Sequence, residues 1–594
     1  MRETLIQLRQ VMEQKHVDIV LIPSSDFHGS EYIGDYFKAR AWMSGFTGSA
    51  GTLVVTRDQA GLWTDGRYFI QAERQLTGSG ITLYKMGQEG VIDFPQFIEQ
   101  EMPQGGCLAF DGRMVSGALG SQLEAMLARK QAQILSTEDL VDLIWKDRPG
   151  LSEAKAVLLE ERYSGRATAQ KLDELRAVMR KEGAEALLIS TLDDLAWLFN
   201  LRGDDVLYNP VVLAYGCVTL EKAVLYLNPR KLSESDRQAL SALNIEIKDY
   251  DTFLGDVAAL TAQTVWADPQ KLNYAILRAI PRHCRRIEKT NPIVLRKAIK
   301  NETEIENLRR SHLKDGVAVT KLMYWLKTRV GKEAMSECSI QTKLHELRAE
   351  QEGFIEESFG TICAYKANAA MMHYSADPQH EVPVAAEGLL LIDSGGQYWE
   401  GTTDITRTFT LGPCSPEIKK VYTTVLQGML NLSEARFLYG CSGINLDILA
   451  RGPVWQLNLD YQCGTGHGVG YLLNVHEGPH GIRWKKTAAL SEMERLEAGM
   501  VVTDEPGVYI EGKFGIRIEN ELIVRRGEKN FYGQFMEFET TTLAPIDLDA
   551  VDPQVLTPAA REALNRYHLR VREALTPYLN EEEAQWLKTA TRSI

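Results

Sequence analysis

The chain has 594 residues, 44% of them hydrophobic and 25% charged, and its formal net charge is -14. This length exceeds what one hydrophobic core supports, so we expect several domains. The negative charge argues against nucleic-acid binding, because backbone phosphates would be repelled. No stretch reaches 18 apolar residues, residues 1–23 lack the pattern of a secretory signal, and the eight cysteines have no paired spacing. The composition therefore predicts a cytoplasmic protein with reduced thiols and no membrane span.

Two segments in the first half of the chain repeat each other at an offset of 167 residues. Residues 8–12 recur as residues 175–179, and in both copies an amphipathic helix leads into a short apolar strand. We predict two similar α/β domains, 1–147 and 148–298, joined next to the Pro-Gly step at 149–150. A chance match of common helix residues is the alternative, and the continued register from residue 8 to residue 32 argues against it.

A third unit, residues 299–594, begins with the pattern of a capped helix. Asn301 followed by Glu304 has the form of a capping box. Residues 354–545 then have the composition of short strands, glycine turns and helices, and Thr557-Pro558 opens a last helix with an apolar stripe.

Acidic residues end or begin two predicted strands of this unit. The apolar run 389–392 ends in Asp393, and Asp404 lies eleven residues later, at the start of an alternating strand. If these strands pair through a wide loop centred near Tyr398, the two carboxylates meet. A tight turn at Gly395-Gly396 would separate them, so the pairing is a hypothesis.

A second predicted hairpin carries two glutamates. Gly512 is the midpoint between Glu505 and Glu519 and lies inside the expected turn. Directly opposed residues on antiparallel strands have Cβ atoms about 5 Å apart. Arg517 lies on the same face as Glu519. Between the two hairpins His467 is flanked by glycines, which allow the backbone to approach a ligand closely.

Opposed glutamates in an apolar hairpin repel each other unless a cation lies between them. Four carboxylates and one neutral imidazole carry a charge of -4, which two divalent cations would balance. Two such ions about 3.5–4 Å apart can activate a bridging water for hydrolysis. Taken singly, each acid could instead cap a turn or pair with Arg407 or Arg517. Taken together, they form a candidate ligand set of Asp393, Asp404, His467, Glu505 and Glu519.

In order and context these five residues resemble the metal ligands of the pita-bread metallopeptidases. Residues 369–374, 400–408, 474–479 and 514–520 are similar to the large three-domain aminopeptidase P form of that family. Residues 63–68 and 197–203 are similar to its creatinase-like N-terminal domains, so the resemblance covers essentially the whole chain. It implies an α/β and α+β multidomain fold, with two creatinase-N-like α/β domains followed by a pita-bread catalytic domain and a C-terminal helical extension.

The resemblance also implies roles for individual residues. Asp393, Asp404, Glu505 and Glu519 would be the carboxylate ligands, with Asp404 and Glu519 bridging two metal ions. His467 would bind one ion. His373 and His476 match outer histidines that hold substrate and assist proton movement, and Arg517 matches an arginine that orients the site. Manganese is the expected metal, because oxygen-rich ligation with one imidazole favours a hard ion. Cobalt, iron and zinc remain alternatives.

Two positions leave alternatives open. Family members commonly have a histidine four residues before the ligand histidine, and Cys463 stands there in this chain. Its thiol could pack as a small apolar group, weakly assist binding, or touch a metal. Asp504 precedes Glu505 and competes with it as a ligand, although the hairpin midpoint and the family pattern both favour Glu505.

The function implied by the resemblance is release of the N-terminal residue from peptides with proline second, by attack of a metal-bridging water or hydroxide. The bond before proline has no N–H and a fixed ring on its leaving side. An Xaa-Pro dipeptidase (prolidase) with the same metals is the first alternative, and a metal-free pita-bread binding protein is the second. The resemblance further implies a homodimer in which the first two domains narrow access to the site.

Overall fold

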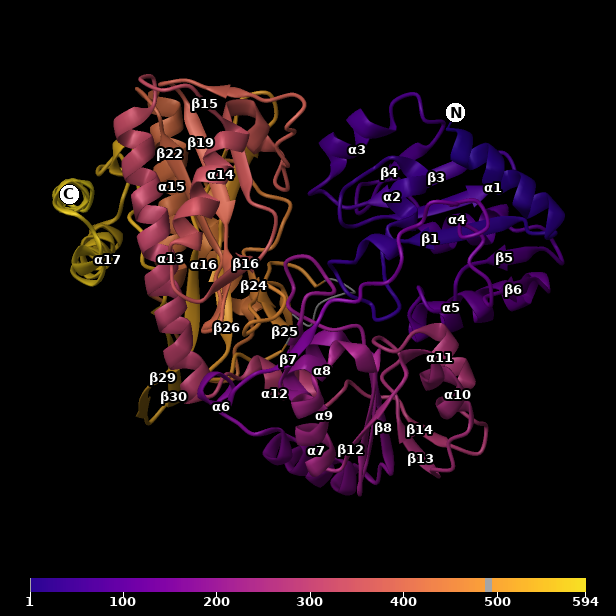
Figure 1. The fold of residues 1–594 in the computed structure, drawn as a ribbon. Coiled ribbons are helices and arrows are strands. Elements are labelled where there is room, and N and C mark those ends of the chain that lie inside the picture. The colour runs from indigo at the N-terminus through magenta and orange to yellow at the C-terminus, as the bar shows by residue number, and fades with distance from the viewer. Residues whose placement is uncertain (1, 487–493) are drawn as a thin grey trace. The chain divides into compact units, whose positions relative to one another are not determined.

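The computed structural model describes residues 2–486 and 494–594 of the chain (Figure 1). These residues form two compact units. The first comprises Met1–Glu161 and Arg166–Val294, and the second comprises Arg162–Gly165 and Leu295–Ile594.

The first unit contains two six-stranded sheets with the same strand order. The first sheet has the order β4-β3-β2-β1-β5-β6 and the second β12-β11-β10-β8-β13-β14, with matching parallel and antiparallel pairs. The strands of these two sheets are β1 (Ile19–Pro23), β2 (Thr52–Thr56), β3 (Ala60–Thr64), β4 (Thr82–Lys85), β5 (Cys107–Ala109), β6 (Gln133–Leu135), β8 (Ala186–Ile189), β10 (Tyr215–Thr219), β11 (Ala223–Tyr226), β12 (Ile245–Lys248), β13 (Thr264–Trp266) and β14 (Arg285–Ile287). The central strands β1 and β8 begin 167 residues apart, which confirms the predicted repeat.

The helix that leads into each central strand buries one apolar face. Helix α1 (Glu3–Gln14) buries Leu5, Leu8 and Met12, and helix α7 (Thr168–Glu182) buries Leu172, Leu175 and Met179 at corresponding positions. The other helices of this unit are α2 (Ala39–Ser44), α3 (Phe69–Leu76), α4 (Phe94–Glu101), α5 (Gly117–Leu127), α8 (Leu192–Phe199), α9 (Glu234–Ala242), α10 (Phe253–Ala258) and α11 (Tyr274–Ala279).

The second unit is built along the long helix α13 (Glu302–Arg329), which Figure 1 shows running the length of the unit. The predicted capping box of Asn301 and Glu304 is present. The predicted tail helix is also confirmed, as α17 (Pro558–Leu575) with Thr557 as its N-cap. The remaining helices of this unit are α14 (Glu337–Ala349), α15 (Pro416–Ser433), α16 (Gly443–Trp455) and α18 (Glu581–Ala590).

Two sheets of the second unit carry the candidate site. One has the order β17-β19-β22 and the other β23-β30-β29-β26-β24-β25, and β27 and β28 form a separate pair. Their strands are β17 (Ile362–Tyr365), β19 (Leu389–Ser394), β22 (Ile405–Thr410), β23 (Arg436–Leu438), β24 (Gly466–Gly468), β25 (Glu477–Ile482), β26 (Val501–Asp504), β27 (Gly507–Ile510), β28 (Phe514–Arg517), β29 (Asn520–Asn530) and β30 (Gly533–Thr540).

The first predicted hairpin forms through a wide loop, but its register differs from the prediction. Strands β19 and β22 pair antiparallel, and Asp393 faces Thr406 rather than Asp404. The difference arises because a small turn of strands β20 (Gly396–Tyr398) and β21 (Gly401–Thr402) centres the loop beyond Tyr398. Asp404 lies two residues from Thr406 and hence on the same face, so the aspartates are diagonal neighbours.

The second predicted hairpin keeps its predicted centre. Both pairs of strands, β27 with β28 and β26 with β29, have a register centred on Gly512, whose φ of +73° forms the turn. The ladder is interrupted at the two glutamates. The N–H of Glu505 donates to the Thr465 carbonyl (2.8 Å), and the N–H of Glu519 donates to the Thr406 carbonyl (3.1 Å). Each glutamate therefore sits where a third segment crosses the hairpin.

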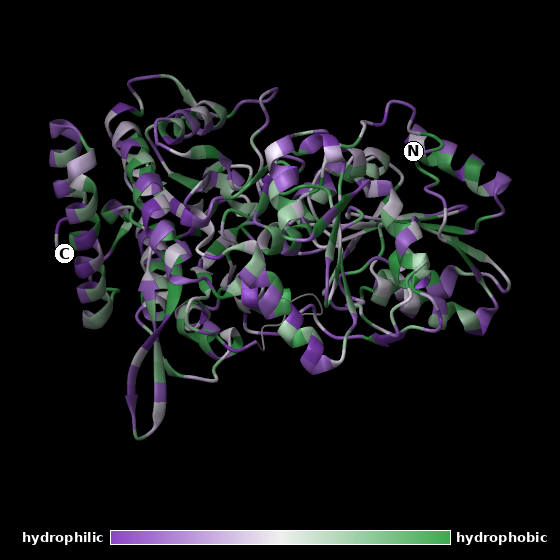
Figure 2. Ribbon diagram, turned by 60° about the horizontal axis from the view of Figure 1, so that its bottom comes forward, coloured by the Kyte–Doolittle hydropathy of each residue, from purple (hydrophilic) through white to green (hydrophobic). Residues whose placement is uncertain are grey.

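Hydrophobic residues concentrate in the strands, while many helices carry hydrophilic residues along one side (Figure 2). Within the described parts of the chain, no helix is long and apolar enough to cross a membrane. All eight cysteines are free thiols.

Candidate metal centre

The candidate ligands lie together in the second unit. Asp404, His467 and Glu519 each offer a ligand atom, and these three atoms lie within 4.8 Å of one another. His467 Nε2 is 3.4 Å from Asp404 Oδ2 and 3.4 Å from Glu505 Oε1. The charge of Asp393 acts on both Asp404 and Glu519. The fold thus gathers all five predicted ligand residues from five separate segments.

Each candidate ligand residue lies at the end of a strand, next to one, or in a very short strand. Asp393 is near the end of β19, Asp404 precedes β22, Glu505 follows β26 and Glu519 precedes β29. His467 is the middle residue of β24, between two glycines. A Cβ on Gly466 would lie 1.9 Å from the Thr503 carbonyl oxygen, and one on Gly468 would lie 2.1 Å from that of Glu477. The neighbouring strands therefore require glycine at both positions, in addition to the predicted close approach of the backbone to a ligand.

Electrostatics in the cluster favour cations. Burial and the neighbouring carboxylates raise the pKa of Asp404 and of Glu519 well above the ordinary range. Asp393 Oδ1 is buried and has no hydrogen-bond partner among the described atoms. Four carboxylates with one imidazole are a donor set for hard divalent ions. The residues present therefore fit the two metal ions that the sequence predicts.

Arg517 connects two of the carboxylates. Its Nη2 donates to Asp393 Oδ2, and its Nε donates to Thr406 Oγ1 at 3.1 Å. Thr406 Oγ1 in turn donates to Glu519 Oε2 at 2.7 Å. The predicted orienting arginine is thus bonded to two strands of the β17-β19-β22 sheet, and through Thr406 it is linked to Glu519, which leads into β29.

The two predicted outer histidines occupy different settings. The rings of His476 and His467 meet edge to face, with centroids 4.3 Å apart. His373 is half-buried in the loop after the 3-10 helix η5 (Lys366–Ala370). That helix is pressed against β28, since a Cβ on Gly515 would lie 1.8 Å from the Ala369 carbonyl oxygen. The loop of His373 is therefore anchored on the strand that carries Arg517.

Cys463 is partly buried beside the apolar core of the unit, which includes Tyr461 and Val508. Its carbonyl oxygen accepts a hydrogen bond from Arg451 Nη2 at 3.2 Å. Burial and the charge of Glu505 raise the pKa of its thiol to about 11. Of the three roles considered for this position, the packing favours that of a small apolar group.

Three further titratable residues are not among the candidate ligands. The Asp504 carboxylate is fully buried, and burial together with the charge of Glu505 raises its pKa well above the ordinary range. Glu505, not Asp504, reaches His467. His380 is exposed and pairs with Asp377 at 2.7 Å, and buried His480 contacts the Val501 carbonyl at 2.7 Å.

Sequence reasoning missed the role of Arg407. It was considered only as an ion-pair partner for an acid, but its guanidinium donates to the Glu519 carbonyl oxygen, to Asn520 Oδ1 (2.8 Å) and to Tyr567 OH (2.8 Å). It therefore holds the backbone of a candidate ligand. The position of Arg407 in the 400–408 motif was the one sequence signal that could have indicated this role.

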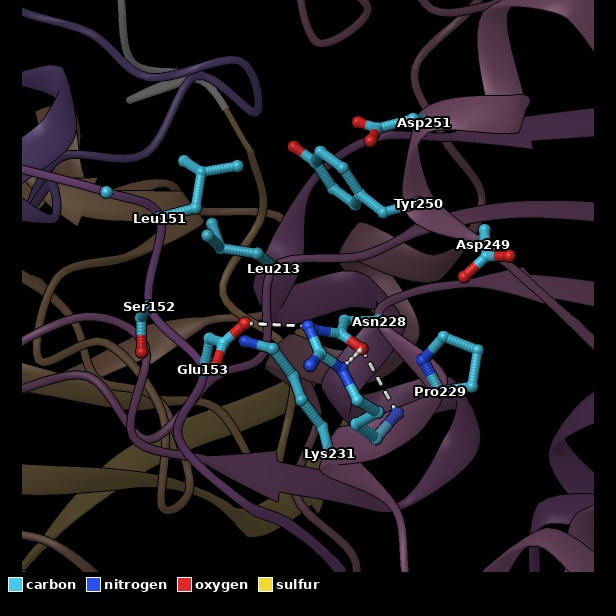
Figure 3. A pocket seen from close by; sticks show the side chains of 12 residues that line it. Leu151, Ser152, Glu153, Leu213, Asn228, Pro229, Lys231, Asp249, Tyr250 and Asp251 are labelled. Carbon is cyan, nitrogen blue, oxygen red and sulfur yellow. Dashed lines mark hydrogen bonds and ion pairs between the residues drawn. The ribbon is translucent and has the colours of Figure 1, made fainter.

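A cavity of about 1030 Å³ lies in the first unit and is lined by none of the predicted site residues (Figure 3). Several of its polar groups are already paired. Glu153 binds Arg230 at 2.8 Å, Asn228 Oδ1 accepts the N–H of Arg230 at 3.1 Å, and Lys231 binds buried Asp205. We assign no ligand to this cavity.

A buried cluster of four carboxylates and one histidine, in a chain that begins with two copies of one α/β fold, defines a metal-dependent hydrolase. The chain belongs to the aminopeptidase P group of metallopeptidase family M24. The family described as Metallopeptidase family M24 matches residues 306–526, and its C-terminal region matches residues 534–594. The Creatinase/Prolidase N-terminal domain matches twice, at residues 5–144 and 147–304.

Relatives match over the whole chain. Aminopeptidase P1 of Arabidopsis thaliana is 36% identical, with 100% of this chain and 99% of that protein covered. A probable Xaa-Pro aminopeptidase P of Paracoccidioides brasiliensis is 37% identical at the same coverage. Among solved structures, the X-prolyl aminopeptidase of Caenorhabditis elegans, described as a cytosolic enzyme with a di-nuclear active site, is 33% identical. It superimposes with a TM-score of 0.95, covering 100% of both chains.

Proposed function

We propose that this protein is a metal-dependent aminopeptidase that releases the N-terminal residue from peptides with proline at the second position. The observation that carries the proposal is the convergence of Asp404, His467 and Glu519 on one point, in a chain whose full-length relatives are aminopeptidases P. The site residues are proposed on the geometry described above.

Two divalent ions would be held by Asp393, Asp404, His467, Glu505 and Glu519. When bound, such ions supply an activated water and polarise the scissile carbonyl. Manganese is the proposed metal, because four carboxylates and one imidazole form a hard donor set. Metal analysis of the purified protein would distinguish it from cobalt, iron or zinc.

The chain's own residues orient these ligands and move protons. Arg517 holds Asp393 in place and, through Thr406, also holds Glu519. The proline nitrogen must gain a proton to leave as a neutral amine, as any peptide nitrogen must. His476, whose ring contacts that of His467, is the proposed proton donor to the substrate. His373 is proposed as the second histidine that holds the substrate and assists proton movement.

Assembly and location are also proposals. A homodimer is supported by apolar side chains exposed on and near α16, namely Ile448, Trp455 and Trp484, the last two in ring contact at 5.9 Å. Sedimentation equilibrium tests the homodimer.

A cytoplasmic location rests on the composition and on the cytosolic enzyme of Caenorhabditis elegans. The domain limits 1–147, 148–298 and 299–594 are likewise proposed.

The test is hydrolysis of Arg-Pro-Pro and of the dipeptide Ala-Pro by protein stripped of metal and resupplied with Mn²⁺. Release of arginine from the tripeptide only with metal supports an aminopeptidase. Cleavage of the dipeptide alone would make the protein a prolidase. Cleavage of neither would favour a binding protein. Asp404→Ala should bind no metal pair and cleave nothing.

A further inference from the structure

A buried ion pair joins two helices next to the loop that connects the candidate aspartates. Asp315 of α13 is 3% exposed and Arg348 of α14 is fully buried. Arg348 Nε donates to Asp315 Oδ1 at 2.7 Å, and its Nη2 donates to Oδ2 at 3.2 Å. The geometry is the two-point contact that an arginine makes with a carboxylate.

This pair also contacts both sides of the loop. Arg348 Nη2 donates to Ser394 Oγ at 3.0 Å, and Thr403 Oγ1 donates to Asp315 Oδ2 at 3.0 Å. Ser394 follows Asp393 in the chain and Thr403 precedes Asp404. A single ion pair therefore bonds to the neighbour of each candidate aspartate ligand.

Ser394 and Thr403 lie near the two ends of the loop, which hydrogen bonds hold together. The N–H of Gly396 donates to Thr403 Oγ1 at 2.9 Å, and the N–H of Thr403 donates to the Gly396 carbonyl at 2.9 Å. A Cβ on Gly395 would lie 1.8 Å from the Thr403 carbonyl oxygen. Beyond these bonds Tyr398, in the same loop, also contacts the ion pair, because its OH donates to Asp315 Oδ1 at 3.0 Å.

We propose that Asp315 and Arg348 are positioning residues that set the spacing of Asp393 and Asp404 and so determine how tightly the site binds metal. This inference rests on the proposed metal centre. Opposite charges make the pair neutral as a whole, so it acts on the carboxylates through geometry. Groups that hydrogen-bond directly to metal ligands typically change affinity or activity about 10–100-fold when lost, and this pair acts on the chain neighbours of two candidate ligands at once.

A purely structural role makes a different prediction. A buried ion pair often adds little net stability, yet removing one partner leaves an unpaired charge that destabilises the fold. Variants of Asp315 or Arg348 would therefore mix folding with positioning. Removing the hydroxyls of Ser394 and Thr403 leaves both charges of the ion pair in place. It also takes away the acceptor of the Gly396 N–H, so the metal-free unfolding temperature is measured beside metal affinity.

The experiment compares Ser394→Ala, Thr403→Val and the double variant with the wild-type protein. Metal-stripped protein is titrated calorimetrically with Mn²⁺, and thermal unfolding is measured without metal. We expect the double variant to bind Mn²⁺ about 10–100-fold more weakly, with a metal-free unfolding temperature close to wild type. Thr403→Ser keeps the hydroxyl and should bind like wild type.

Arg309→Met is the matched control. Arg309 is on α13, the helix of Asp315. It makes a two-point ion pair with Glu539, at 2.7 Å and 2.9 Å, without touching the loop. Its metal affinity should equal that of wild type. Unchanged Mn²⁺ affinity in the double variant would overturn the positioning role, whatever its unfolding temperature. Asp404→Ala distinguishes failure of the positioning role from failure of the proposed metal centre. If this variant still binds two Mn²⁺ ions, the proposed metal centre itself is wrong. If it does not, only the positioning role has failed.

Discussion

Arg517 donates a hydrogen bond to Asp393, and the side chains are only 3% and 12% exposed. Through Thr406 the same guanidinium is linked to Glu519. Asp393 is on the β17-β19-β22 sheet, whereas Glu519 leads into β29 of the six-stranded sheet. One buried cation therefore fixes carboxylates of two sheets relative to each other.

Replacing Arg517 by lysine should keep the charge but lose the second directed contact. A lysine ammonium is a point charge and cannot reach Asp393 and Thr406 with fixed geometry. We expect kcat/KM for Arg-Pro-Pro to fall about 10–100-fold, together with weaker Mn²⁺ binding in the calorimeter. Lys513→Met, at an exposed pair with Glu417, is the control and should match wild type. Wild-type activity in Arg517→Lys would contradict the role.

Asp404→Asn should stabilise the metal-free protein and destabilise the metal-loaded one relative to wild type. The folded-state pKa of Asp404 is raised, so the metal-free wild type loses stability as pH rises above the unfolded-state value. That loss is about 1.4 kcal/mol per pH unit until the folded-state pKa is reached. Asparagine removes it. Thermal unfolding at several pH values, with and without Mn²⁺, should show the two proteins exchange order. Equal metal-free stability at all pH values would show that Asp404 is not under strain from its neighbours.

The parts of the fold that depend on short stretches of sequence could be predicted. The repeat was visible because helix periodicity and strand residues recur at one offset, and the turn at Gly512 because glycine marks the centre between two alternating strands. The register of β19 against β22 was missed by two residues. The small turn formed by Tyr398 and Gly401 moves the loop centre, and nothing in the local pattern indicates it.

The residues that orient the candidate ligands could not be predicted, because their contacts depend on which distant segments pack together. Asp315 and Arg348 lie on two helices whose sequences show only amphipathic helix patterns, and their bonds to Ser394 and Thr403 exist only in the packed fold. Arg407 likewise reaches Tyr567, 160 residues further along the chain. Sequence patterns predict the candidate ligand residues, whereas the residues that orient them become visible only in three dimensions.

Cys463 should be unreactive and dispensable. With its pKa raised to about 11, only about one thiol in a thousand is ionised at pH 8, and the thiolate is the reactive form. Peptide mapping after iodoacetamide treatment of folded protein should find Cys463 largely unmodified, and modified after unfolding in urea. Cys463→Ala should retain activity within about threefold, because the side chain packs as a small apolar group. Rapid labelling of the folded protein, or loss of metal from Cys463→Ala, would show instead that the thiol takes part in the site.

His568 should make the protein sensitive to mild acid. Burial, reinforced by Arg407, Arg572 and Arg592, lowers its pKa to about 3 in the folded state. The unfolded chain takes up a proton near pH 6.5, so folded-state stability is complete above that pH and is lost as pH falls, by about 1.4 kcal/mol per unit. Its Nε2 accepts the N–H of Ile546 at 3.1 Å, which a glutamine oxygen can also do. Urea unfolding of metal-free His568→Gln between pH 7 and pH 5 should show a loss about 2 kcal/mol smaller than wild type. His480, with a pKa lowered to about 4, keeps a residual slope in both proteins. Identical pH dependence in the two proteins would mean that His568 is already protonated in the fold.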